Sequence, residues 1–206
     1  LHSLDELEAR EATGEVLVLS AHDFALVNPN TGAAPIFRTR RDADITTRIY
    51  RQHPVLVRHA ADGEQRAWPV KYARMFDMTN DSGKFMKPGE LQQHGWQPAP
   101  LNRWRKGGEE ALPLDEGKMV QMFDHRAADV VVNTANLKRA AQQASVGSSE
   151  KESPERYPTA QYWVAKSDVS TTWGGTWCIA YNAVPAASHM RPMVAALIPA
   201  SGVGNS

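Results

Sequence analysis

The chain has 206 residues, of which 42% are hydrophobic and 22% are charged, values typical of one large or two small globular domains and unlike those of a disordered chain. Lysine plus arginine and aspartate plus glutamate number 23 each, so the composition excludes a strong overall field for a polyanionic partner. Any nucleic-acid surface must therefore arise from local clusters of charge.

Short helices and turns are predicted for the first part of the chain. Ser3 is expected to cap a helix over residues 4–11, and Ser20 with Asp23 forms a capping-box pattern before a second short helix. Between these helices, "EVLVLS" predicts a buried strand. The composition of "NPNTG" predicts a turn after the second helix.

The middle of the chain predicts a longer helix followed by strands. Asp42 is expected to cap this helix, with Ile45, Ile49 and Tyr50 as its apolar stripe. The runs "PVLV" and "KYARMF" predict strands, and "PGELQQHGW" predicts a short helix that begins at its proline and ends at its second glycine. The two glycines of "LNRWRKGGEEALPL" predict a hairpin.

The last part of the chain is predicted to be rich in strands. Residues 135–158, which include "SVGSSEKESPER", are polar and predict a mobile loop. The runs "QYWVA", "TWCIAY" and "MVAALIP" predict three strands. We therefore expect an α+β fold with a mixed or mostly antiparallel sheet and several short helices.

Several motifs of known chemistry are absent from the sequence. It contains no phosphate-binding or dinucleotide-binding glycine motif, no G-x-S-x-G and no H-x-x-x-H pair of histidines. The single cysteine, Cys178, excludes an internal disulfide, fits a reducing compartment and lies in an apolar run typical of buried thiols. No apolar run approaches the roughly 20 residues of a membrane span. We therefore expect a cytoplasmic chain with no membrane partner.

A cluster of arginines is the strongest local charge feature. Planar guanidinium groups suit phosphate oxygens, so the cluster predicts contacts with a phosphate backbone. The alternative is a solvated helix face on which the arginines pair with Asp44 at helical spacing. The cluster comprises Arg38, Arg40, Arg41, Arg48, Arg51 and Arg58, opposed within that span only by Asp42 and Asp44.

Two further patterns suggest chemistry. "NRWRK" places Trp104 among Arg103, Arg105 and Lys106, a texture that suits base or sugar contacts but also occurs in ordinary hairpins. "PLDEGK" contains an E-x-K pattern, Glu116 and Lys118, that holds Mg²⁺ in many nucleases. Asp77 or Asp81 could supply the upstream carboxylate, so a Mg²⁺-dependent nuclease domain is an alternative function.

Long blocks of the sequence, in one order, resemble a known family. They are "NPNTGAAPIFRTRRDADITTRIYRQHPVLV", "RMFDMTNDSGKF", "LPLDEGKMVQMFDHR", the short "YWVA", and "IAYNAV" with "RPMVAALIPASGVGNS". Together they resemble the C-terminal part of large Eco57I-like adenine-specific DNA methyltransferases of restriction-modification and phage-defence systems. The resemblance spans nearly the whole chain.

The resemblance implies two functional segments along the chain. It implies that residues 1–60 are a linker or helical segment joining a catalytic domain that lies outside this sequence. Residues 61–206 would be the target recognition domain, with the polar loop near 135–158. The implied partners are double-stranded DNA and the catalytic domain of the same parent chain.

The resemblance also implies that this part of the parent enzyme is not catalytic. The glycine turn that binds S-adenosylmethionine and the Asn-Pro-Pro-aromatic motif are both missing, and "NPNT" lacks the aromatic residue. We therefore expect no cofactor here, although the parent enzyme would use S-adenosylmethionine. A third alternative is a structural module that only docks proteins.

The sequence departs from the family at two places. Asp115 stands where relatives tend to carry an aromatic residue, and Pro192 follows Arg191 where they favour threonine. Recognition domains each read a different site, so these departures leave the target sequence open. The residues that we predict to contact DNA are Arg38, Arg40, Arg41, Arg51, Arg103, Trp104, Arg105, Lys118, His125, Arg126 and Arg191.

Overall fold

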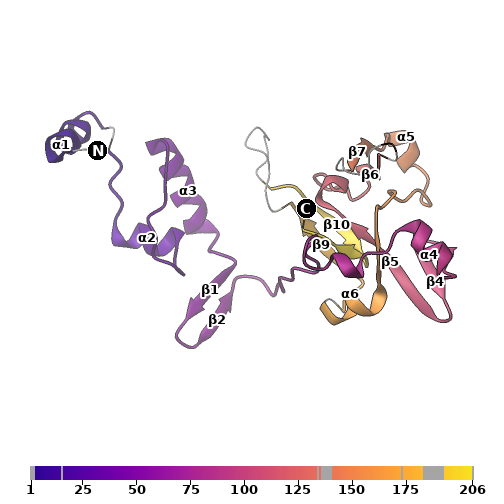
Figure 1. Cartoon of the computed structure of the whole chain (residues 1–206). Helices are drawn as coiled ribbons and strands as arrows, with labels where there is room; N and C mark the ends of the chain where they lie inside the picture. Colours follow the sequence, from indigo (N-terminus) through magenta and orange to yellow (C-terminus); the bar gives the residue numbers. More distant parts are fainter. Residues whose placement is uncertain are drawn as a thin grey trace. The chain divides into compact units, whose positions relative to one another are not determined.

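The chain has a mixed α+β fold, and its computed structural model describes residues 3–14, 16–133, 135, 141–172, 174–182 and 193–205. It divides into two compact units, Leu1–Lys71 and Tyr72–Ser206, shown in indigo to purple and in magenta to yellow in Figure 1. The expected α+β class, with short helices and mostly antiparallel strands, is confirmed.

The first unit contains three helices and a hairpin: α1 (Leu4–Ala12), α2 (Ala21–Val27), α3 (Arg40–Gln52), β1 (Val57–Ala60) and β2 (Gly63–Arg66). Local capping fixes where the helices begin. The Ser3 hydroxyl accepts a hydrogen bond from the Glu6 amide at 3.2 Å, and Ser20 and Asp23 form the predicted capping box. A short side chain in extended backbone satisfies the free amides of the first turn in each case.

Three predictions for this unit are wrong in detail. Thr39, and not Asp42, caps α3, because its hydroxyl accepts the Asp42 amide at 3.1 Å. Residues 16–20 of "EVLVLS" are not in a strand, and Val18 is 73% exposed. An apolar run needs a neighbouring strand to become part of a sheet, and none pairs with it among the described residues. Of "PVLV", only Val57 lies in β1.

A five-stranded sheet organises the second unit. Its strands are β3 (Gln97–Ala99), β4 (Arg103–Lys106), β5 (Glu109–Asp115), β8 (Trp163–Ala165) and β11 (Gly202–Val203). β5 pairs antiparallel with β4 and β8 and parallel with β11. The β4–β5 turn uses Gly107 and Gly108 at φ 54° and 92°, which confirms the predicted hairpin, since glycine adopts positive φ at little cost.

Two hydrophobic clusters lie on opposite faces of this sheet. Ala111 and Trp163 belong to one cluster, whereas their sequence neighbours Leu112 and Val164 belong to the other. Successive side chains on a strand point to opposite faces, so both faces of β5 and β8 are buried. This explains the continuous apolar runs "ALPL" and "YWVA".

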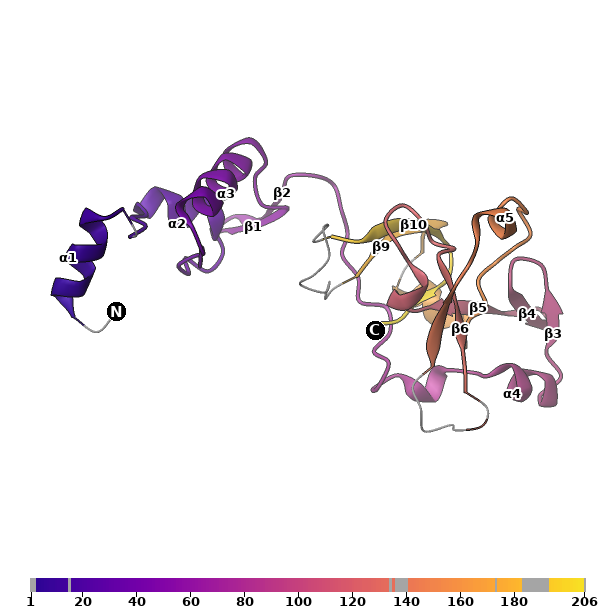
Figure 2. The same cartoon turned by 90° about the horizontal axis from the view of Figure 1, so that it is seen from above.

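Smaller elements complete the second unit. Its short helices are η1 (Ser82–Lys84), α4 (Pro88–Gln93), η2 (Gly117–Met119), α5 (Ser148–Lys151) and α6 (Lys166–Thr172). Two antiparallel pairs are formed by β6 (Ala128–Val131) with β7 (Gln142–Ser145) and by β9 (Trp177–Tyr181) with β10 (Ala195–Pro199), as Figure 2 shows. The predicted proline start and glycine end of α4 are confirmed. "KYARMF" forms no strand, although Phe76 makes one bridge to Gly204.

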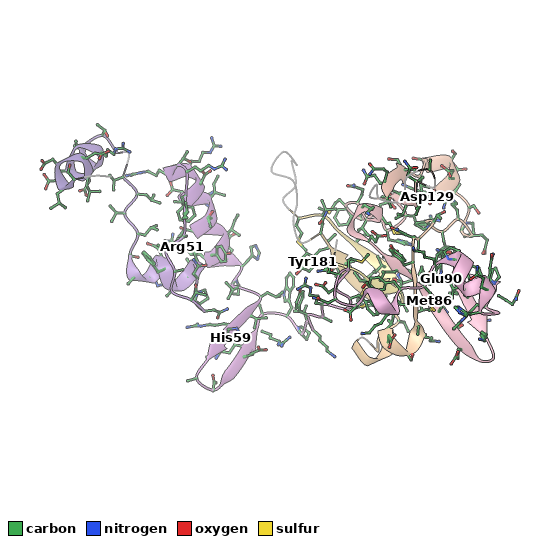
Figure 3. The ribbon with its side chains drawn as sticks, in the orientation of Figure 1. Arg51, His59, Met86, Glu90, Asp129 and Tyr181 are labelled. Carbon is green, nitrogen blue, oxygen red and sulfur yellow. The ribbon has the colours of Figure 1, made fainter. Side chains whose placement is uncertain are left out.

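The segment predicted as a polar loop is folded where it is described. It contains β7 and α5, and Val146 is 5% exposed. Arg156 forms an ion pair at 2.6 Å with Asp129, the residue that Figure 3 labels. Charged hydrogen bonds supplement the few apolar contacts of this segment, and a composition argument does not detect them.

The C-terminal strand β11 occupies a site without room for a side chain. A Cβ atom added to Gly202 would lie 2.7 Å from Val164 Cγ2 and 3.0 Å from Leu114 Cδ1, both in fully buried residues. We expect Gly202→Ala to lower the free energy of unfolding by about 1–3 kcal/mol through overpacking. Urea denaturation measures the change.

Gly204→Ala is the matched control for this prediction. Its added Cβ would meet the Met78 sulfur at 2.5 Å, the end of a flexible side chain that can rotate away. The substitution should therefore cost less than Gly202→Ala. Equal stabilities of the two variants and the wild type would contradict tight packing of β11 against the sheet.

Candidate nucleic-acid interface

The inward face of α3 differs from the one that its apolar residues predict. Ala43 is 3% exposed and Tyr50 is half-buried, and α2 packs against this helix. Ile45 and Ile49 are instead 44% and 51% exposed. The predicted stripe is therefore wrong for both isoleucines, and the buried residue of α3 is instead the small Ala43.

The exposed side of α3 carries four arginines. At about 100° per residue, Arg40, Arg41, Arg48 and Arg51 fall within about 100° of one another around the helix axis. All four are exposed. The helix therefore presents four arginines to solvent on one side, with the exposed Asp44 among them and the two exposed isoleucines beside them.

The arginines of the first unit differ in what holds them. Arg40 donates a hydrogen bond to the Val16 carbonyl at 3.3 Å, and Arg51 lies 3.8 Å from an Asp23 oxygen. No ion pair or side-chain hydrogen bond within the described residues holds Arg38, Arg41, Arg48 or Arg58. No ion pair of Asp44 with these arginines is found among those residues, but Asp44 lies on the same side of α3 and offsets one of its positive charges.

A cavity of about 280 Å³ lies at the start of α3. Phe37, Arg38, Thr39 and Arg40 line it, together with residues 14, 16 and 17. The first turn of a helix carries the positive end of its dipole. Two guanidinium groups and the first turn of a helix thus line this cavity. Their positive charge favours the binding of a negatively charged group there.

The two arginines of the second predicted patch, "NRWRK", share one carboxylate, that of Glu110, with Lys166. Arg105 donates two hydrogen bonds to Glu110, at 2.7 and 2.9 Å, and Lys166 donates another at 2.6 Å. Arg103 lies 3.9 Å from the same carboxylate. The hydrogen bonds from Lys166 and Arg105 lower the pKa of Glu110 to about 2.

Trp104 belongs to the core and not to the surface. It is 7% exposed and packs edge-to-face on Trp163, with ring centroids 6.2 Å apart. Its ring cannot stack on a base without leaving this cluster. The alternation of strand β4 explains the result, because the flanking Arg103 and Arg105 point to the opposite face.

Three more residues that we predict to contact DNA lie after β5. Each is held by other groups of the protein or is partly buried. Lys118 pairs with the buried Glu116 at 2.9 Å. Arg126 donates hydrogen bonds to the carbonyl oxygens of Lys151, Ser153 and Arg156. His125 is partly buried, and burial, with the nearby Arg126 charge, lowers its pKa. Arg191 lies outside the described residues.

The carboxylates proposed for the nuclease alternative have other roles. Asp77 accepts the Thr79 and Asn80 amides at 3.0 Å and pairs with Arg74, while Asp81 pairs with Lys84 at 2.9 Å. In the part of the chain that the structure describes, no three His, Cys, Asp or Glu side chains gather as metal ligands do.

The strongest candidate interface thus lies on the first unit. Arg48 and Arg58 belong to it by exposure; both are members of the predicted arginine cluster, although the final list of predicted DNA contacts omits them. Helices of a length and polarity suited to crossing a membrane do not occur among the described residues. Comparisons with protein-family models, with curated proteins and with solved structures give no match.

Proposed function

We propose that this chain is the DNA-recognition part of an adenine-N6 DNA methyltransferase, with a fold of the target-recognition-domain kind. Its partners would be double-stranded DNA and the catalytic domain of the parent enzyme. The parent would use S-adenosylmethionine, which this part does not bind. The ordered sequence blocks that resemble this family support the proposal.

The observation that carries the proposal is a group of exposed arginines on one side of α3, in contrast to several arginines of the second unit that are held internally. In the second unit, Arg105, Arg126 and Arg156 are held by carboxylates or carbonyl groups. In the first unit, Arg41 and Arg48 stand exposed on one side of α3 without such partners among the described residues. Exposed guanidinium groups without internal partners can pair with the phosphates of a polyanion that lies against that face.

The first test measures the salt dependence of DNA binding. Each neutralised phosphate contributes a slope of about −0.9 to log K against log salt. We expect Arg41→Ala and Arg48→Ala each to flatten that slope by about one unit, on a cognate and a random duplex alike. Fluorescence anisotropy between about 50 and 200 mM salt gives the slopes.

Arg105→Ala is the matched control, because Arg105 is as exposed as the α3 arginines but is held by Glu110. Its slope should equal that of the wild type. Retained binding with unchanged slopes for both α3 variants would remove α3 from the interface. A wild-type chain that shows no salt-sensitive binding to any duplex would refute the proposed function itself.

A further inference from the structure

The two-stranded sheet β9–β10 has an apolar face that the described residues leave largely exposed. Exposure alternates along both strands, as in a sheet with one buried face: Cys178, Ala180, Ala196 and Ile198 point inward. Sheets of this kind normally place polar residues outward. Here the outer face is Trp177, Ile179 and Tyr181 opposite Pro199, Leu197 and Ala195, and it holds no acidic or basic side chain.

Large side chains make this outer face extensive. Trp177, Ile179 and Leu197 are 55%, 62% and 56% exposed, and Tyr181, labelled in Figure 3, is 47% exposed. The ring of Tyr72, 68% exposed, lies 6.4 Å from that of Tyr181. The sequence of each strand is thus typical of a strand buried on both faces, although only one face is buried.

Phe123 flanks the same sheet in a strained conformation. Its amide donates a hydrogen bond to the Ala195 carbonyl of β10 at 2.8 Å, and its side chain is 86% exposed. Its φ of 61° lies in the left-handed region, which costs a bulky residue on the order of 1–3 kcal/mol. This exposed aromatic ring adds to the apolar surface beside β10.

The extent of this surface fits a stable protein interface. These exposed fractions, taken with the roughly 200 Å² of a large apolar side chain, give on the order of 700 Å². The largest apolar patch of a monomer is about 300–600 Å², and a stable interface buries about 800 Å² on each partner. The surface therefore has nearly the size that one partner contributes.

We infer that the outer face of β9–β10 binds a second copy of this chain. In a two-fold symmetric dimer the side chains near the axis meet their own copies, so a charge there would face a like charge. A face without charged side chains avoids that repulsion, and two such faces can pack as the sheets of a sandwich do. It also lacks the cations that phosphates require. The inference does not rest on the proposed function.

The test is the oligomeric state of the full chain in the absence of DNA. We expect sedimentation velocity to show a monomer–dimer equilibrium that is mostly dimer by about 100 µM, as for a dissociation constant near 10 µM or below. Leu197→Asp and Ile179→Asp alter one central cross-strand pair. Each should raise the dimer dissociation constant about 100-fold, because the substituted residue is present on both partners of the dimer interface.

Two controls separate a lost interface from a lost fold. Ile36→Asp changes an apolar residue that is 96% exposed in the first unit, and it should leave the dimer intact. Trp177→Lys, at the end of β9, tests the same face if the central variants do not fold. A wild-type chain that stays monomeric at about 100 µM would overturn the inference. So would folded variants that dimerise as the wild type does.

Discussion

Arg126→Ala should lower the free energy of unfolding by about 2–4 kcal/mol and leave the salt dependence of DNA binding unchanged. The guanidinium group donates hydrogen bonds at 2.8–3.2 Å to the carbonyl oxygens of Lys151, Ser153 and Arg156. Hydrogen bonds to charged groups contribute about 1.5–3 kcal/mol, and the substitution leaves partly buried carbonyls without donors. Urea denaturation and the anisotropy titration measure the two effects.

Arg74→Ala is the control for charge removal. Arg74 forms an exposed i,i+3 pair with Asp77 at 3.0 Å, and surface pairs contribute only about 0–1 kcal/mol. Arg126→Lys should be intermediate, since one ammonium group cannot reach all three carbonyls. A flatter salt slope with unchanged stability in Arg126→Ala would instead return this residue to the DNA interface.

Asp115→Asn should stabilise the protein at pH 7 by up to about 3 kcal/mol. Desolvation raises the pKa of Asp115 to about 6, although a hydrogen bond from the Ser201 hydroxyl at 2.6 Å acts in the opposite direction. Each pKa unit corresponds to about 1.4 kcal/mol of difference between the two protonation states. Asparagine keeps an acceptor for Ser201 and removes the poorly solvated charge.

The sign of the pH dependence follows from the raised pKa. The folded state binds the Asp115 proton more tightly than the unfolded state, whose pKa is 3.8. The stabilising contribution is therefore complete below about pH 4 and is lost as the pH rises to about 6. Asp115→Asn should remove this fall in stability between pH 4 and 6. An unchanged stability at pH 7 would indicate a solvated carboxylate.

Local sequence determined where most helices and the tightest turn lie. Ser3, the Ser20 and Asp23 pair, and Gly107 with Gly108 act on backbone groups within about four residues of themselves. Such hydrogen bonds form in the same way whatever the rest of the chain does. For this reason the first two helices and the β4–β5 hairpin could be predicted from short stretches of letters.

Tertiary structure decided which charged side chains are available to a binding partner and which apolar faces are covered. Arg126 and Arg41 look alike in the sequence, but only Arg126 finds three carbonyl groups, 25 to 30 residues away. Ser201 reaches Asp115 across 86 residues. Helical periodicity predicted that Ile45 is buried, whereas Ala43 is the buried residue of α3. Each of these outcomes depends on a partner far along the chain, and local periodicity and composition carry no information about that partner.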